Sequence, residues 1–204
     1  MSHAYQFKYD RPNSHTDPFD CYLTCKKCTA QTKNGQICRN NVCIGINDPS
    51  YCHIHMKSKL QLQLQNVEDM GKGLFAYDKT KHIANEPIFK ADDIICSYNG
   101  QKITTQKNNQ RYGTGQVFAG PYTVSQRIIR KPNRVEDAAC LRGLGAMVNH
   151  DPNPNAVIIL HKNKFKIKAI EDIFHNEQIF VNYGYNPVDN LYNVNTSTKY
   201  KKRV

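Results

Sequence analysis

Short runs of alternating apolar and polar residues dominate the hydrophobic pattern of this chain. The clearest run is Leu60–Gln65, where leucine and glutamine alternate strictly, as in a strand with one buried face. Further short apolar runs bounded by turn residues predict strands at 74–76, 87–89, 94–98, 122–124, 157–160, 165–170 and 178–182. Many short strands at close spacing predict a mostly β fold.

Helical periodicity is confined to one segment, Val135–Val148. Its apolar residues form a partial helical stripe, so we predict a helix there. The polar Lys57-Ser58-Lys59 run before the first predicted strand indicates a boundary between a small N-terminal part and a larger main domain. No apolar run reaches the ~20 residues of a membrane span, and no signal peptide is evident, so we expect a soluble, intracellular protein in a reducing compartment.

The cysteines change this picture, because six of the eight lie in the N-terminal part. In a reducing compartment such crowding indicates metal before disulfide. The sharpest set is Cys28, Cys38, Cys52 and His55, and the short spacing of the last two suits one tetrahedral zinc ion. The set resembles a small Cys3His module seen in virus and microbial proteins.

The other cysteines leave alternatives open. A second zinc site from Cys21, Cys25, Cys43 and His53 is one alternative; free thiols or small core residues are the other. Cys96 and Cys140 lie in apolar stretches and are expected to be packing residues.

The net charge of +11 is concentrated at the two ends of the chain. Residues 1–60 carry eight Lys/Arg against four Asp/Glu, and the tail from Lys199 to Arg203 carries four basic residues. Basic ends beside a nearly neutral middle suit contact with nucleic acid, or simply solubility.

Two strings near the C-terminal end carry the candidate chemistry. Val148-Asn149-His150 leads into a Pro/Asn turn that fixes the backbone presenting two hydrogen-bonding side chains. The string from Glu177 to Tyr185 alternates like a strand and then reaches Tyr183-Gly184, where glycine allows close approach.

Together with Gly71-Lys72-Gly73-Leu74-Phe75 upstream, these strings resemble the SET-domain protein lysine methyltransferases. The resemblance implies small curled sheets around a knot-like crossing. It also implies a flexible N-terminus (1–20), a zinc module (21–58), a SET domain (60–187) and a basic tail (188–204).

The resemblance implies residue roles as well. Tyr183 matches the catalytic tyrosine, with Tyr98 and Tyr185 as aromatic walls of a lysine channel. S-adenosylmethionine, which leaves as S-adenosylhomocysteine, would contact the following residues: Gly71, Lys72, Gly73, Leu74, Asn149, His150 and Tyr183. The alternative for each tyrosine is an ordinary core or surface aromatic, and a lone Gly-x-Gly is more often a simple turn.

Three departures from the family pattern weaken inference about the substrate. Asn182 stands where an acidic residue commonly precedes the tyrosine, and Ala146 stands where an arginine is frequent. Pro152 replaces the cysteine of a C-terminal zinc cluster, and no cysteine follows Cys140.

The predicted function is transfer of methyl groups to lysine in a histone or viral histone-like protein. An Asn- and Lys-rich composition suggests a virus-encoded protein of the nucleus, viral factory or virion. The alternative is an inactive SET fold whose zinc module docks on nucleic acid or chromatin; a third reading is a methyltransferase of a ribosomal or virion protein.

Overall fold

A computed structural model describes residues 6–8, 20–22, 24–68, 70–112, 123–126 and 134–183. The helical elements are α1 (His53–Leu60), α2 (Lys79–Ala84), α3 (Thr105–Tyr112) and the 3-10 turn η2 (Leu144–Met147). The strands are β1 (Gln6–Lys8), β2 (Asp20–Tyr22), β3 (Lys26–Lys27), β4 (Asn41–Val42), β5 (Ile44–Ile46), β6 (Leu62–Val67), β7 (Gly71–Ala76), β8 (Ile94–Ser97), β9 (Gln101–Ile103), β10 (Thr123–Gln126), β11 (Arg134–Asp137), β12 (Arg142–Gly143), β13 (Asn149–His150), β14 (Ala156–His161), β15 (Lys164–Ala169) and β16 (Phe180–Val181).

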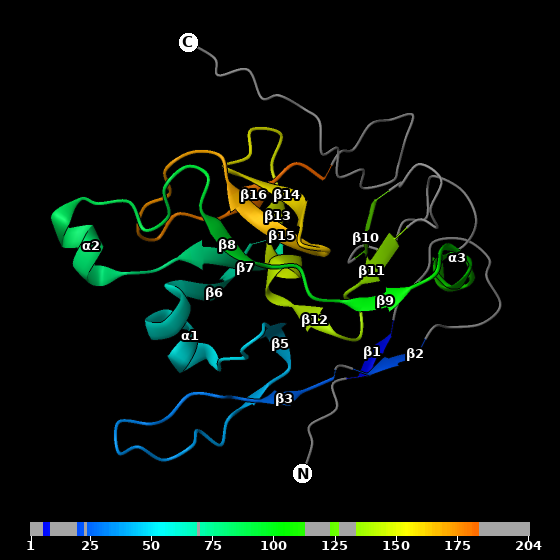
Figure 1. The fold of residues 1–204 in the computed structure, drawn as a ribbon, viewed down its shortest axis with the longest axis horizontal. Helices are drawn as coiled ribbons and strands as arrows, with labels where there is room; N and C mark the ends of the chain where they lie inside the picture. The colour runs from blue at the N-terminus through cyan, green and yellow to red at the C-terminus, as the bar shows by residue number, and fades with distance from the viewer. Residues whose placement is uncertain are drawn as a thin grey trace.

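These strands form small, curled sheets, which confirms the predicted mostly β fold (Figure 1). The largest sheet has the strand order β13-β16-β14-β15-β8. Along β15, Phe165, Ile167 and Ala169 are buried, whereas the lysines between them point away from the core. This alternation is the period of a strand with one buried face.

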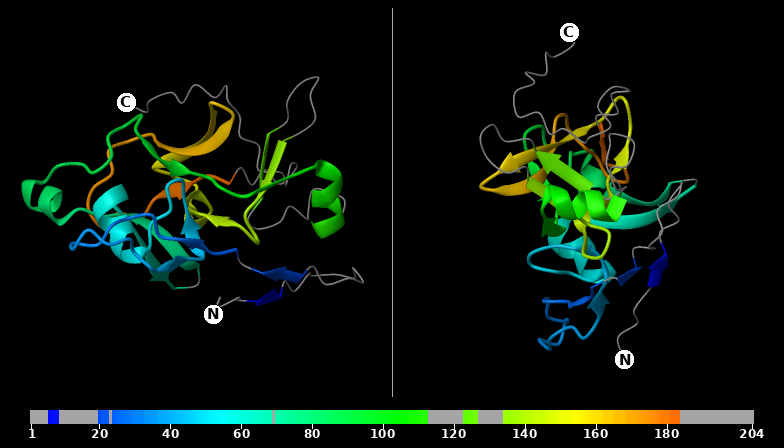
Figure 2. Two further views of the ribbon diagram at one scale, coloured as in Figure 1. Left: turned by 60° about the horizontal axis from the view of Figure 1, so that its bottom comes forward. Right: turned by 90° about the vertical axis from the view of Figure 1, so that its right-hand side faces the viewer.

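Smaller sheets surround the large one. The β6–β7 hairpin confirms the strand predicted from the leucine–glutamine alternation, and β10, β11 and β9 form a separate three-stranded sheet. Helices α2 and α3 lie at opposite ends of the molecule, as two views agree (Figures 1 and 2). Of the described helices, none is both long and apolar enough to cross a lipid bilayer.

The main core joins the N-terminal part to the rest of the chain. Met56 of α1 is buried in the same cluster as Leu62, Leu74 and Leu144, and Tyr51 packs against both this cluster and the cysteine-rich one. In addition, β5 pairs in parallel with β12. The two parts therefore share packing and hydrogen bonds across the boundary that the polar Lys57-Ser58-Lys59 run indicated.

The predicted helix at Val135–Val148 is wrong. The segment contains β11, β12 and η2 instead, and β11 lies between β9 and β10 in its sheet. Successive residues from Leu144 to Val148 are all buried, and this continuous burial placed apolar residues at the spacing that suggested a helix. A segment buried on every side loses the periodicity that distinguishes helix from strand.

Two further differences are local. Residues 87–89 form no strand but a single bridge between Phe89 and Ile173. Helix α2 was not predicted, although Asp78 caps it by accepting hydrogen bonds from the backbone N–H groups of Thr80 and Lys81. Its side chains include no buried residue, so it carries no apolar stripe.

Candidate functional site: a thiol–imidazole cluster and a tyrosine-lined cavity

Four predicted metal ligands come together in the N-terminal part. The ligand atoms of Cys28, Cys38, Cys52 and His55 all lie within 4.8 Å of one another, and the three cysteines are buried. The Cys52 Sγ is 3.3 Å from the His55 Nδ1, and the Cys28 Sγ is 3.5 Å from the same nitrogen. Three thiols and one imidazole at this spacing fit the tetrahedral donor set of structural zinc.

Local structure explains how the four ligands meet. Cys28 and Cys38 flank a hairpin whose turn uses Gly35 with a φ of 75°, a conformation that favours glycine. Cys52 is the N-cap residue of α1, and His55 follows within its first turn. A Cys-x2-His spacing at a helix N-terminus therefore directs both side chains to one point.

The surroundings of Cys52 favour its thiolate. Burial opposes the charged form, but hydrogen bonds from the backbone N–H groups of His55 and Ile54 and from the Asn40 amide outweigh it, and the pKa of Cys52 falls to about 6. For Cys38, a hydrogen bond from the backbone of Asn40 lowers the pKa, but burial and the neighbouring sulfurs of Cys28 and Cys52 raise it overall. One thiol is thus held ready to bind a cation, since metal ligands must be deprotonated.

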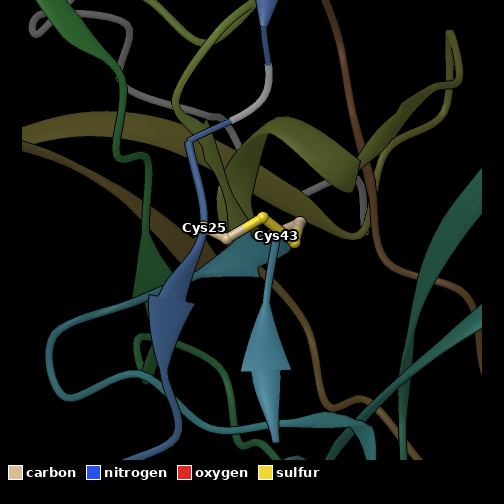
Figure 3. The surroundings of a disulfide bond; sticks show 2 residues. All are labelled: Cys25 and Cys43. Atoms are coloured by element: carbon tan, nitrogen blue, oxygen red, sulfur yellow. A yellow bond between two sulfur atoms is a disulfide. The ribbon is translucent and has the colours of Figure 1, made fainter. Parts of the chain in front are cut away.

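The second set of cysteines differs from the alternatives drawn from the sequence. Cys25 and Cys43 form a disulfide (Figure 3), so they are neither a metal-bound pair nor free thiols in this structure. His53 is exposed, and the side chain of Cys21 lies outside the described residues. Cys140 is also disulfide-bonded rather than a simple packing residue, whereas Cys96 is buried as expected.

Tyr183 lies beside the Asn149–His150 segment. Its hydroxyl donates a hydrogen bond to the Val148 carbonyl at 2.7 Å, and its backbone N–H donates to the His150 Nδ1 at 3.1 Å. The His150 and Tyr183 rings are 5.3 Å apart between centroids. The two strings that are over thirty residues apart in the sequence thus form one unit.

A small cavity of about 20 Å³ opens between Tyr98 and Tyr183. Its wall is mainly apolar and consists of Tyr98, Thr123, Val124, Gly145, Ala146, Val148, Ile158, Val181 and Tyr183. A Cβ on Gly145 would come within 2.9 Å of the Tyr98 Cα, so glycine is what allows Tyr98 to reach this wall. Tyr185, Gly184 and the tail lie outside the described residues.

The three sequence strings converge through strand pairing. The Ile179 N–H donates to the Leu74 carbonyl at 2.8 Å, which brings the glycine-containing strand β7 against the segment leading into β16. Strand β16 pairs in parallel with β13, with Asn149 opposite Phe180 and His150 opposite Val181. The glycine string and the Asn-His string therefore flank the same short segment.

The residues predicted to bind the methyl donor fall into two groups: those that offer a side chain and those that offer only their backbone. The Asn149 Nδ2 is buried and has no hydrogen-bond partner among the described residues, as expected of a donor that awaits a ligand acceptor. Gly71 and Lys72 are exposed, whereas Leu74 is fully buried and offers only its backbone. Gly73 is also required by packing, because a Cβ there would collide with the Gln178 amide.

Sequence reasoning missed two polar residues of this region. Thr123 lines the cavity, and its buried Oγ1 has no partner among the described residues. Asn155 accepts a hydrogen bond from the Phe180 N–H at 2.8 Å and donates to the Gln178 carbonyl at 2.9 Å, which holds β16 in place. Asn155, in the Pro/Asn turn, could have been found as a side chain that competes for backbone groups.

Comparison with known proteins matches this arrangement. A family model described as the SET domain matches residues 82–184. The histone-lysine N-methyltransferase EZH2 of Chaetomium thermophilum is 24% identical over 198 residues, covering 81% of this chain and 13% of that protein. A chain in a structure of ctPRC2 in complex with H3K27me3 and H3K27M aligns with a TM-score of 0.46 and 24% identity, over 60% of this chain and 14% of that one.

The chain thus spans only a small part of the length of the relatives it matches. The SET-domain match, however, extends over just over half of the chain and includes β13, Tyr183 and the wall of the cavity. With these features in the predicted order, the chain belongs to the SET-domain family, a family of protein lysine methyltransferases.

Proposed function

We propose that this protein is an S-adenosylmethionine-dependent protein-lysine N-methyltransferase whose substrate is a histone or histone-like protein. The main observation behind this proposal is the position of the Tyr183 hydroxyl, which the Val148 carbonyl holds at the wall of a cavity that Tyr98 also lines. Because this hydroxyl donates its proton to a backbone carbonyl, its oxygen keeps lone pairs that can accept an N–H of a substrate amine.

The cavity suits an amine that must lose its charge before it reacts. A free lysine has a pKa of ~10.4, so an apolar wall favours the neutral form by desolvation. Val148, Ile158 and Val181 supply apolar surface, while the Tyr183 oxygen orients the nitrogen lone pair. Holding the amine in line with the methyl group supplies most of the rate.

The methyl donor supplies an electrophilic methyl group on a sulfonium. We assign its contacts to the backbone of Gly71–Leu74 and to the side chains of Asn149, His150 and Tyr183. The buried, unpartnered Asn149 Nδ2 supports this assignment, because a donor group in that state fits a polar ligand atom. Tyr185 is proposed as a further channel wall on sequence grounds alone.

The zinc cluster is proposed to be structural. Its four donors leave no open position for a substrate, which is the pattern of a structural rather than a catalytic site. We propose the residue ranges 21–58 for this module and 60–187 for the methyltransferase domain, followed by a basic tail. The N-terminal lysines and the tail are proposed to contact nucleic acid.

Similarity to a histone-lysine methyltransferase supports a histone-like substrate in the nucleus or a viral factory, and the Asn- and Lys-rich composition supports a virus-encoded enzyme. The second candidate is an inactive SET fold that binds nucleic acid or chromatin. It is favoured by the departures at Asn182 and Pro152, but the intact Tyr183, Asn149 and His150 argue against it.

Methyl transfer from labelled donor to core histones tests the proposal. We expect label in a histone lysine with wild-type protein, and labelling slower by ~10² or more with Tyr183→Phe. Tyr77→Phe is the matched control, because the Tyr77 ring contacts His175 and Lys57 rather than the cavity. If the protein binds DNA but neither binds the methyl donor nor transfers a methyl group, the inactive SET fold is favoured. If label enters only virion or ribosomal proteins, the substrate is one of those proteins rather than a histone.

A further inference from the structure

A groove in the N-terminal part shares no residue with the tyrosine-lined cavity. One wall is the loop between β3 and β4, which is closed by hydrogen bonds from the Thr32 N–H to the Gln36 carbonyl at 2.7 Å and from the Cys38 N–H to the Ala30 carbonyl at 2.8 Å. The other wall is the first turn of α1, which lies beside this loop (Figure 1). The groove has a volume of about 510 Å³, enough to receive side chains of a bound peptide.

The thiol–imidazole cluster lies at the junction of the two walls. Cys38 and His55 line the groove, and both belong to this cluster. Because the four ligands come from the loop and from the start of α1, a metal ion bound by them would hold the two walls together. A groove that is fixed in this way loses little conformational entropy when it binds a partner.

Each wall of the groove carries an exposed isoleucine. Ile37 on the loop is 73% exposed, and Ile54 on α1 is 57% exposed. The side chains of Thr32, Gln36 and Asn40 surround them with polar groups. Exposed apolar surface with a polar rim is typical of a site that contacts another protein.

The charge around this apolar surface is positive. Lys33 and Arg39 line the groove, and the Lys27 Nζ donates a hydrogen bond to the Arg39 carbonyl at 3.3 Å. Among the described residues no carboxylate lines the groove, and Asp48 is the only acidic residue of the stretch 24–60. Neither Lys33 nor Arg39 forms an ion pair within the described part of the chain. Carboxylates of a partner would therefore complement the groove.

We propose that this groove binds an acidic segment of a partner protein that also carries apolar side chains. The apolar side chains would lie against Ile37 and Ile54, and the carboxylates would lie against Lys33 and Arg39. A basic, histone-like tail does not match this charge, so the partner is distinct from the proposed substrate. Docking here requires no methyl transfer and stands apart from the proposed function.

Nucleic acid matches the groove less well than an acidic peptide does. Sites for single-stranded nucleic acid use aromatic side chains on which bases stack, and no described aromatic residue lines this groove. A phosphate backbone would satisfy the cations but would leave Ile37 and Ile54 without an apolar partner. An acidic peptide with apolar side chains satisfies both kinds of residue.

Selection from a random peptide library displayed on phage, with the full chain as bait, tests the groove. We expect selected peptides to carry Leu, Ile, Val or Phe beside Asp or Glu, and to bind more weakly as salt rises. Ile37→Ser and Ile54→Ser should each weaken a selected peptide about tenfold through lost apolar contact. Lys33→Glu should weaken it by at least as much, because it reverses a charge. Ile83→Ser is the matched control, since Ile83 is 86% exposed on α2, outside the groove.

Three results would overturn the proposal: no enriched peptide, enriched peptides without acidic residues, or equal affinity in the wild type and the Ile37→Ser/Ile54→Ser double variant. Duplex DNA binding that this double variant abolishes would assign the groove to nucleic acid instead. The thermal midpoint of each variant shows whether it is folded. If a variant unfolds, methyl NMR of the wild type decides, because a selected peptide should shift the Ile37 and Ile54 resonances. Shifts confined to other methyl groups would contradict the groove.

Discussion

At the scale of single residues, the Tyr183 hydroxyl is the group on which catalysis should depend most. Tyr183→Phe removes the atom that would orient the amine, so we expect methyl transfer to slow by ~10² or more, the scale of losing a positioned catalytic group. The lost hydrogen bond to Val148 should cost only about 1 kcal/mol in the free energy of unfolding. Transfer at the wild-type rate, measured in single turnover, would remove Tyr183 from the mechanism.

A change at Asn149 should affect binding of the methyl donor without affecting orientation of the amine. Its buried Nδ2 has no partner among the described residues, so Asn149→Ala should leave folding nearly unchanged. A ligand atom that loses this partner should weaken donor binding by about 1–3 kcal/mol. Calorimetric titration of the donor measures this directly. Asn153→Ala, at an exposed position in the following turn, is the matched control, and equal affinity in the two variants would place the donor elsewhere.

At the scale of elements, a buried ion pair fastens α3 to the sheet that supplies part of the cavity wall. The Arg111 Nη1 lies 2.6 Å from the Asp137 Oδ2, and the Asp137 side chain is fully buried. The Ala139 N–H donates to the other carboxylate oxygen, and the Arg111 Nη2 donates to Gln101. Strand β11 carries Asp137 and pairs with β10, which carries Thr123 and Val124.

We expect Arg111→Met to lower the free energy of unfolding by about 3 kcal/mol, because it removes the guanidinium that pairs with the buried Asp137 carboxylate. Lys107→Met on the same helix is the control, since Lys107 is exposed. Urea unfolding monitored by circular dichroism provides both values. A loss below about 0.5 kcal/mol, the range of ordinary surface substitutions, would show that this pair does not hold α3.

At the scale of the whole molecule, the zinc module and the SET domain should unfold together. Met56 and Tyr51 connect the two clusters, and β5 pairs with β12. Removing zinc with a chelator should therefore lower the thermal midpoint of the whole chain in one cooperative step, seen alike by circular dichroism and tyrosine fluorescence. A module that melts separately while the rest keeps its original midpoint would show instead that the two parts unfold independently.

Local information was sufficient for several features. Period-2 alternation predicted β6, and a short apolar run bounded by turn residues predicted β15, since both patterns are local wherever the strand lies. The spacing of Cys28, Cys38, Cys52 and His55 predicted their cluster, because a tight turn and one helical turn are local geometries. The order of the three strings indicated the family that the SET-domain match then showed.

Other features were decided only by the tertiary structure. The segment Val135–Val148 was predicted to be a helix, but pairing with the distant strand β9 makes its first part strand β11. In its last part, Leu144–Val148, the burial of every residue removes the periodicity that distinguishes helix from strand. The Cys25–Cys43 disulfide, the backbone hydrogen bond from Thr24 to Cys140 and the cavity between Tyr98 and Tyr183 also join residues far apart in sequence. A sequence determines local periodicity and ligand spacing through short-range geometry, whereas contacts between residues far apart in the sequence depend on how the sheets pack.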